Sequence, residues 1–119
     1  MKKRGGGSII SMSFIGSVLA VPHYHVMGPA KASLESSSRY LAKEVGPDNI
    51  RVNVIAPGFI ETEMTDNLSE NIIENWKNNI PLKRIGKPGD VANACIFLAS
   101  DMSEYITGQV IQVDGGMLT

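Results

Sequence analysis

The sequence predicts an α/β fold in which parallel strands alternate with helices. Three short β-compatible segments, of which the second is made mostly of β-branched residues, each have glycine or proline at or next to at least one end, and longer helix-compatible segments separate them. Connections of that length are typical of parallel sheets, in which right-handed crossovers place the helices on the two faces. A composition of 43% hydrophobic and 19% charged residues is that of a globular protein. We therefore expect residues 1–119 to form a single domain around one core.

The three expected strands are short. The first covers Ser8–Ser13, follows three glycines and leads into a loop at residues 14–21. The second covers Ile50–Ala56, where most residues are β-branched, and Pro57-Gly58 ends it. The third covers Gly108–Val113 and leaves through a glycine-rich turn. The order along the chain is therefore strand, helix, strand, helices, strand.

Helices are expected between these strands. The first begins at Pro22, whose fixed φ suits a first turn, and ends near Val45, because Gly46-Pro47 follows. Three- and four-residue steps predict its buried face, which comprises Tyr24, Met27, Ala30, Leu34, Ser38, Leu41 and Ala42. A polar segment at 63–79 could form a mobile cover, with an apolar face made of Met64, Leu68, Ile72, Ile73 and Trp76. Lys87–Asp90 opens a last helix that ends at Ala99.

Charge and hydropathy exclude several classes of protein. The net charge is −1 and the sequence has no basic stripe, so we expect no nucleic-acid partner. No apolar run approaches the roughly 20 residues of a membrane-spanning helix. The basic start and the apolar stretch after it imitate a secretory signal, but glycines and serines interrupt the stretch and favour a strand. We expect a protein that does not enter membranes.

Cysteine and histidine usage points to a cytoplasmic protein without a metal site. The lone Cys95 cannot form an internal disulfide, and its apolar surroundings in sequence predict a buried thiol in a reducing compartment. His23 and His25 flank Tyr24, but no third ligand is evident, so no metal is expected.

Three motifs then occur in a fixed order. They are Tyr24 with Lys31, the segment Asn53–Thr62, and the segment Ile106–Gly116. Together they resemble the short-chain dehydrogenase/reductase family, over about Gly7 to Met117. The resemblance implies a partial Rossmann-like doubly wound parallel sheet, the carboxyl-terminal half of that fold. The amino-terminal dinucleotide-binding half of the family, with its glycine-rich turn, is absent from this sequence.

Tyr24 and Lys31 are the expected catalytic pair. An unperturbed tyrosine has a pKa of about 10, and a neighbouring ammonium favours the phenolate, which makes the hydroxyl a better acid. Seven positions are just under two helical turns, so both side chains project to the same side of one helix. The resemblance implies that Tyr24 delivers a proton and that Lys31 also binds the ribose of NADH or NADPH.

The residues around this pair resemble one branch of the family. Six residues separate the tyrosine and the lysine here, as in enoyl-acyl-carrier-protein reductases, whereas most family members have three. Phe14 occupies the place of the serine that ketone-reducing members use, and Met27 also matches the enoyl reductases. Ser13 could replace that hydroxyl if the loop shifted by one residue. The resemblance implies substrate contacts from Phe14, Tyr24 and Met27.

The downstream half resembles a different branch. Ala56–Thr65 and Ile80–Pro88 are similar to 3-oxoacyl-acyl-carrier-protein reductases. Glycine suits a close backbone approach to a ligand. The resemblance implies that the cofactor-binding residues, besides Lys31, are Pro57, Gly58, Ile60 and Thr62.

Our first expectation is therefore an NAD(P)H-dependent oxidoreductase of fatty-acid synthesis that reduces the double bond of an enoyl-acyl-carrier-protein thioester. One alternative is a 3-oxoacyl-acyl-carrier-protein reductase or another short-chain alcohol dehydrogenase. Another is an inactive fragment that acts only by associating with family members. Lys83, Arg84 and Lys87 could steer an acidic carrier protein. The resemblance also implies a homo-oligomer, a dimer or tetramer, in the full-length form.

Overall fold

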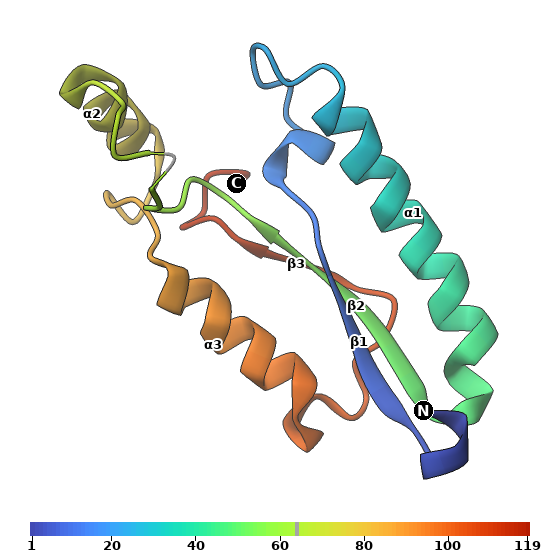
Figure 1. Cartoon of the computed structure of the whole chain (residues 1–119). Coiled ribbons are helices and arrows are strands. Elements are labelled where there is room, and N and C mark those ends of the chain that lie inside the picture. The colour runs from blue at the N-terminus through green and yellow to red at the C-terminus, as the bar shows by residue number, and fades with distance from the viewer. Residues whose placement is uncertain (64) are drawn as a thin grey trace.

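A three-stranded parallel sheet forms the centre of the computed structural model, which describes residues 1–63 and 65–119 (Figure 1). Its strands are β1 (Gly7–Met12), β2 (Ile50–Pro57) and β3 (Val110–Val113), in the order β1-β2-β3. Both pairings are parallel, with Gly7 opposite Ile50 and Val54 opposite Val110. The predicted parallel α/β fold is confirmed.

Helices cover both faces of this sheet. Helix α1 (Met27–Val45) lies on one side and α3 (Pro88–Ala99) on the other, while α2 (Glu70–Asn79) lies beyond the carboxyl end of β2 (Figure 1). Short 3₁₀ helices form at Lys2–Arg4, Ile15–Ser17, Gly46–Asp48 and Asp101–Ser103. Within residues 1–63 and 65–119, no helix combines the length and apolarity that crossing a bilayer requires.

The central strand β2 forms the core. Val52, Val54 and Ile55 are at most 1% exposed, as expected for a parallel strand covered on both faces. Asn53 is also fully buried, and its amide donates to Ile106 O at 2.8 Å while its carbonyl accepts from the Gln109 N–H at 3.1 Å. These two hydrogen bonds attach the segment that precedes β3 to the central strand β2.

The start of α1 differs from the prediction. The helix begins at Met27, not at Pro22, and His23 has a left-handed φ of 68° within the preceding turn. Pro29 instead occupies the first turn, where the N–H that proline lacks has no intrahelical partner to lose. Tyr24 therefore lies in the turn before α1, so the expectation that Tyr24 and Lys31 share one helix is wrong.

The buried face of α1 is also shifted. Its buried residues are Gly28, Glu35, Ser38 and Ala42, so only the last two belong to the predicted face. Tyr24 and Met27 are 42% and 47% exposed. The cause is a close backbone approach, since a Cβ on Gly28 would lie 2.7 Å from Gly16 O. Gly28 therefore faces the domain, and Met27 beside it does not.

The remaining elements agree more closely with expectation. Helix α1 ends at Val45 before Gly46-Pro47, and α3 begins at Pro88, with the Asp90 carboxylate accepting from the Lys87 N–H at 2.7 Å. The predicted helix at 63–79 is shorter, because α2 starts only at Glu70. Met64 of its predicted apolar face lies outside the described residues. Cys95 is partly exposed, so the expected full burial of its thiol is not observed.

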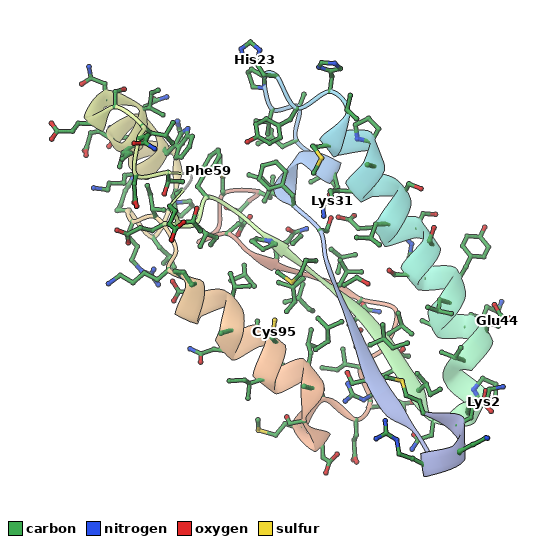
Figure 2. All side chains as sticks on the ribbon, in the orientation of Figure 1. Lys2, His23, Lys31, Glu44, Phe59 and Cys95 are labelled. Atoms are coloured by element: carbon green, nitrogen blue, oxygen red, sulfur yellow. The ribbon has the colours of Figure 1, made fainter. Side chains whose placement is uncertain are left out.

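An aromatic stack attaches α2 to the rest of the domain. None of the residues of α2 is buried. Its Trp76 lies flat on Phe59, with ring centroids 3.9 Å apart and an interplanar angle of 2° (Figure 2 labels Phe59 below α2). Because Phe59 follows Gly58 directly, the stack couples α2 to the turn after β2.

Trp76→Leu should loosen α2 without unfolding the sheet. An aromatic pair contributes about 0.5–1.5 kcal/mol beyond its buried area, so amide protection in α2 should fall roughly three- to tenfold. Hydrogen exchange read by mass spectrometry measures this, and Trp76→Phe, which keeps an aromatic ring, is the matched control. Equal protection of α2 in both variants would contradict the role of the stack.

Candidate functional site

The carboxyl ends of the three parallel strands meet at one edge of the sheet. A cavity of about 730 Å³ opens there, between the loop after β1 and α2. Its lining residues come from the segments after β1 and β2, from α2 and from the chain after β3: Phe14, Leu19, Ala20, Val21, Pro22, His23, Tyr24, Gly58, Phe59, Ile60, Thr62, Thr65, Leu68, Ile72, Trp76 and Met117. This edge is where ligands bind in open α/β sheets.

Most of the predicted site residues reach this cavity. Phe14, Tyr24, Gly58, Ile60 and Thr62 line it. Lys31, Met27 and Pro57 are not among its lining residues, and Met27 is 47% exposed at the first position of α1. The structure therefore brings together one aromatic pair and the turn after β2, while Lys31 on α1 is outside the cavity lining.

Tyr24 and Phe14 form an aromatic pair in the wall of the cavity, and Tyr24 adds a hydroxyl group. Their ring centroids are 5.5 Å apart and the rings are tilted by 38°. The Gly28 N–H donates to Tyr24 O at 2.9 Å, so the first helical turn of α1 is attached to the tyrosine backbone. Tyr24 is 42% exposed and lines the cavity, so a ligand in the cavity can contact this residue.

Lys31 points inward from α1. Its Nζ donates to Met12 O, the last carbonyl of β1, at 2.8 Å, and Figure 2 shows the side chain directed from α1 toward that strand. An ammonium carries three donors. One is used in this bond, so two can serve a ligand at the carboxyl edge of the sheet.

Ser13 does not take over the role of the absent serine hydroxyl. It is only 6% exposed, and its hydroxyl donates to the carboxylate of Glu35, which is 7% exposed. The hydroxyl is therefore directed into the contact between β1 and α1. Sequence reasoning missed Glu35. The signal for it was the spacing of the small and polar residues of α1, which continues from Gly28 through Lys31, Glu35 and Ser38.

The turn after β2 is shaped by the end of the chain. A Cβ on Gly58 would lie 2.8 Å from the Cα and Cβ of Asp114, so the glycine is needed for the close approach of the turn that follows β3. Ile60 pairs with Gly86 as an isolated parallel bridge, in which Glu61 N–H and Phe59 C=O bond Gly86. In such a bridge the N–H of Ile60 itself points the other way.

Thr62 is held in a tight local turn. Its N–H donates to Thr65 Oγ1 at 2.8 Å, and the Thr65 hydroxyl donates to Thr62 O at 2.7 Å. Both residues line the cavity. These bonds fix the Thr62 backbone at the wall of the cavity.

Apolar side chains make up most of the remaining cavity wall. The predicted apolar face of the 63–79 segment is confirmed for Leu68, Ile72 and Trp76, which line the cavity. Sequence reasoning did not identify the contributions of Leu19, Val21 and Met117, because these residues come from a loop and from the chain end, where no periodicity marks a buried face.

Two of the three residues of the predicted basic patch, Lys83 and Arg84, make contacts within the chain. Arg84 pairs with Asp90 at 2.7 Å, and this guanidinium, together with the Lys87 N–H, lowers the pKa of Asp90 to about 2. Lys83 donates to Asn78 O at 2.8 Å. Across residues 1–63 and 65–119, no group of three or more His, Cys, Asp and Glu residues could hold a metal ion.

Comparisons with known proteins show which family this chain resembles. A family model described as Enoyl-(Acyl carrier protein) reductase matches residues 1–118. The 3-oxoacyl-[acyl-carrier-protein] reductase FabG of Chlamydia trachomatis is 50% identical over 117 residues, which are 98% of this chain and 47% of that protein. The FabG of Thermotoga maritima matches at 45% identity over 99% of this chain and 48% of that protein.

An enoyl reductase and a solved structure match as well. The enoyl-[acyl-carrier-protein] reductase [NADH] FabI of Nostoc sp. is 49% identical over 93% of this chain and 44% of that protein. A short-chain type dehydrogenase/reductase from Mycobacterium ulcerans superposes with a TM-score of 0.95 at 35% identity, covering 99% of this chain and 44% of that one. The chain thus spans about half the length of the relatives that it matches. It belongs to the short-chain dehydrogenase/reductase family.

Proposed function

We propose that this chain carries the proton-donating side of an NAD(P)H-dependent reductase of acyl-carrier-protein thioesters. The observation that carries the proposal is the position of Tyr24, whose side chain lines an apolar cavity at the carboxyl edge of the sheet, in the turn seven residues before Lys31. The acyl chain would lie along the aliphatic wall formed by α2, and its carbonyl end would meet the tyrosine hydroxyl.

In this reaction Tyr24 supplies the proton. A thioester that gains a hydride at carbon develops negative charge on an oxygen, an alkoxide for a ketone substrate and an enolate for an enoyl substrate. The Tyr24 hydroxyl would donate its proton or a hydrogen bond to that oxygen. Lys31 is held by its bond to Met12 O, so its positive charge stays at the carboxyl end of β1.

The residues present fit a nicotinamide cofactor. Lys31 has two donors free for ribose hydroxyls, the Ile60 N–H points away from Gly86, and the Thr62 side chain stands at the same edge. Lys31, Ile60 and Thr62 would hold the nicotinamide end of the cofactor, with Pro57 and Gly58 shaping the turn beside it. When bound, NADH or NADPH would supply the hydride.

Reduction of a 3-oxoacyl thioester is the first candidate reaction. FabG proteins of different bacteria match nearly the whole chain at up to 50% identity. They favour the ketone over the enoyl substrate that the Tyr24–Lys31 spacing alone suggests. The polar turn after β2 belongs to the segments that resemble these reductases.

Reduction of an enoyl thioester is the second candidate, and a specific observation favours it. Phe14 presents a phenyl ring next to Tyr24, and Ser13 is committed to Glu35. The wall after β1 therefore offers no hydroxyl to a ketone oxygen from either residue. The FabI of Nostoc sp. matches the chain at 49% identity.

Turnover of two thioesters decides between the candidates. The chain, alone and joined to the amino-terminal half of C. trachomatis FabG, is offered acetoacetyl- and crotonyl-acyl-carrier protein with NADH or NADPH, and loss of reduced cofactor is followed by absorbance. We expect faster turnover of the ketone. Tyr24→Phe should lower either rate about 10²- to 10⁴-fold, because a positioned acid contributes that much.

Two outcomes would count against this proposal. Undiminished turnover by Tyr24→Phe would contradict the role of the tyrosine. Turnover by neither the chain nor the fusion would favour a protein that acts only by association.

Phe14→Ser should shift the preference toward the ketone. A hydroxyl at this place can donate to the developing oxyanion, and one such donor is worth roughly tenfold or more in rate. The measurement is the ratio of acetoacetyl to crotonyl turnover in the fusion. Phe97→Ser, a matched change on the distant helix α3, should leave the ratio unaltered. A ratio that does not rise in Phe14→Ser would show that position 14 does not choose the substrate.

A further inference from the structure

Lys31 and Glu35 stand one turn apart on α1 but do not pair. Residues four apart on a helix are neighbours, and opposite charges at that spacing normally attract. Here Lys31 Nζ donates to Met12 O at 2.8 Å, and Glu35 accepts from the Ser13 hydroxyl. The ion pairs found among residues 1–63 and 65–119 are Lys2–Asp48 and Arg84–Asp90, which involve neither residue.

The two contacts are made by consecutive residues at the end of β1. Met12 is the last residue of the strand, and Ser13 continues it, with its N–H donating to Ile55 O at 2.7 Å. The Met12 carbonyl accepts from Lys31 on one turn of α1, and the Ser13 hydroxyl donates to Glu35 on the next turn. The backbone bond to β2 therefore holds both partners in place.

The burial of Glu35 makes the serine contact necessary. A carboxylate that is 7% exposed is destabilising unless a donor satisfies it. Ser13, itself 6% exposed, is that donor. Without it, the cations one turn away along the helix are Lys31 and Arg39, and of these Arg39 is exposed whereas Lys31, with its flexible four-carbon stem, is half-buried.

We propose that Ser13 is a positioning residue for Lys31. By donating to Glu35, it keeps this carboxylate from drawing the ammonium along the helix, and so Lys31 stays at the carboxyl end of β1. The inference rests on the proposed function in one respect, which is that Lys31 must stay at the carboxyl end of β1 to bind a cofactor. The contacts of Ser13, Glu35 and Lys31 do not depend on that function.

A double-variant design on the 119-residue chain tests this proposal. Ser13→Ala, Glu35→Gln and the combination of both are treated with formaldehyde and cyanoborohydride, and methylation of Lys31 is quantified by peptide mass spectrometry. Lys43, an exposed lysine of the same helix, is the internal reference. An amine in an ion pair with a carboxylate stays protonated and reacts more slowly.

We expect Ser13→Ala to slow methylation of Lys31 relative to Lys43 by at least about threefold. Glu35→Gln alone should leave the ratio near that of the parent chain. The double variant should restore it, because glutamine cannot form the ion pair. A residue with only a structural role would not be rescued by a second change in the core.

The proposal is overturned if folded Ser13→Ala reacts like the parent chain, or if the double variant is as slow as Ser13→Ala. Circular dichroism monitors folding. If Ser13→Ala does not fold, Ser13→Cys takes its place, because a thiol keeps the volume and is a weaker donor, and the same slowing and rescue are expected. A failure of thioester turnover would not change these labelling ratios, so the two proposals can fail separately.

Discussion

The position of β2 between two parallel partners is the constraint on which the rest of the structure depends. Because β1 and β3 both run parallel to it, the three strands end at the same edge of the sheet. The segments after Met12, Pro57 and Val113 must therefore meet there. The cavity, the tyrosine and the turn around Gly58 all follow from that meeting.

The docking of α1 on this sheet positions the residues to which we assign the proposed reaction. The close approach of Gly28 to Gly16 sets where the helix begins, and it leaves Tyr24 in a turn at the cavity. Lys31 and Glu35 are then hydrogen-bonded to Met12 and Ser13, respectively, at the end of β1. A side chain in a turn can face the cavity, while the lysine behind it is held by the rigid helix and strand.

Strong local signals allowed much of this fold to be predicted from the sequence. The β-branched run of β2, the stop at Gly46-Pro47 and the opening of α3 at Pro88 each depend on residues within the element itself. The start of α1 could not be predicted in this way, because both Pro22 and Pro29 suit a first turn and a tertiary contact of Gly28 decides between them. The same contact shifts the buried face by one residue, which hid the role of Glu35.

The candidate site was predictable only in part. Residues within recognisable motifs, such as Tyr24 and Ile60, do line the cavity, but Met27 does not, and the wall formed by Leu19 and Met117 came from segments without periodicity. Tertiary proximity between loops leaves no repeating signal along the chain. The resemblance suggested the chemistry that we propose, whereas the structure showed which side chains line the cavity.

Amide chemical shifts of the labelled 119-residue chain, recorded during titration with NADH and with NADPH, show where a nicotinamide cofactor binds. We expect the perturbed amides to cluster at the carboxyl edge of the sheet, around Lys31, Ile60 and Thr62, and Lys31→Met to weaken the response. Shifts confined to the opposite edge, near Gly7 and Ile50, or a response that Lys31→Met leaves intact, would contradict this expectation.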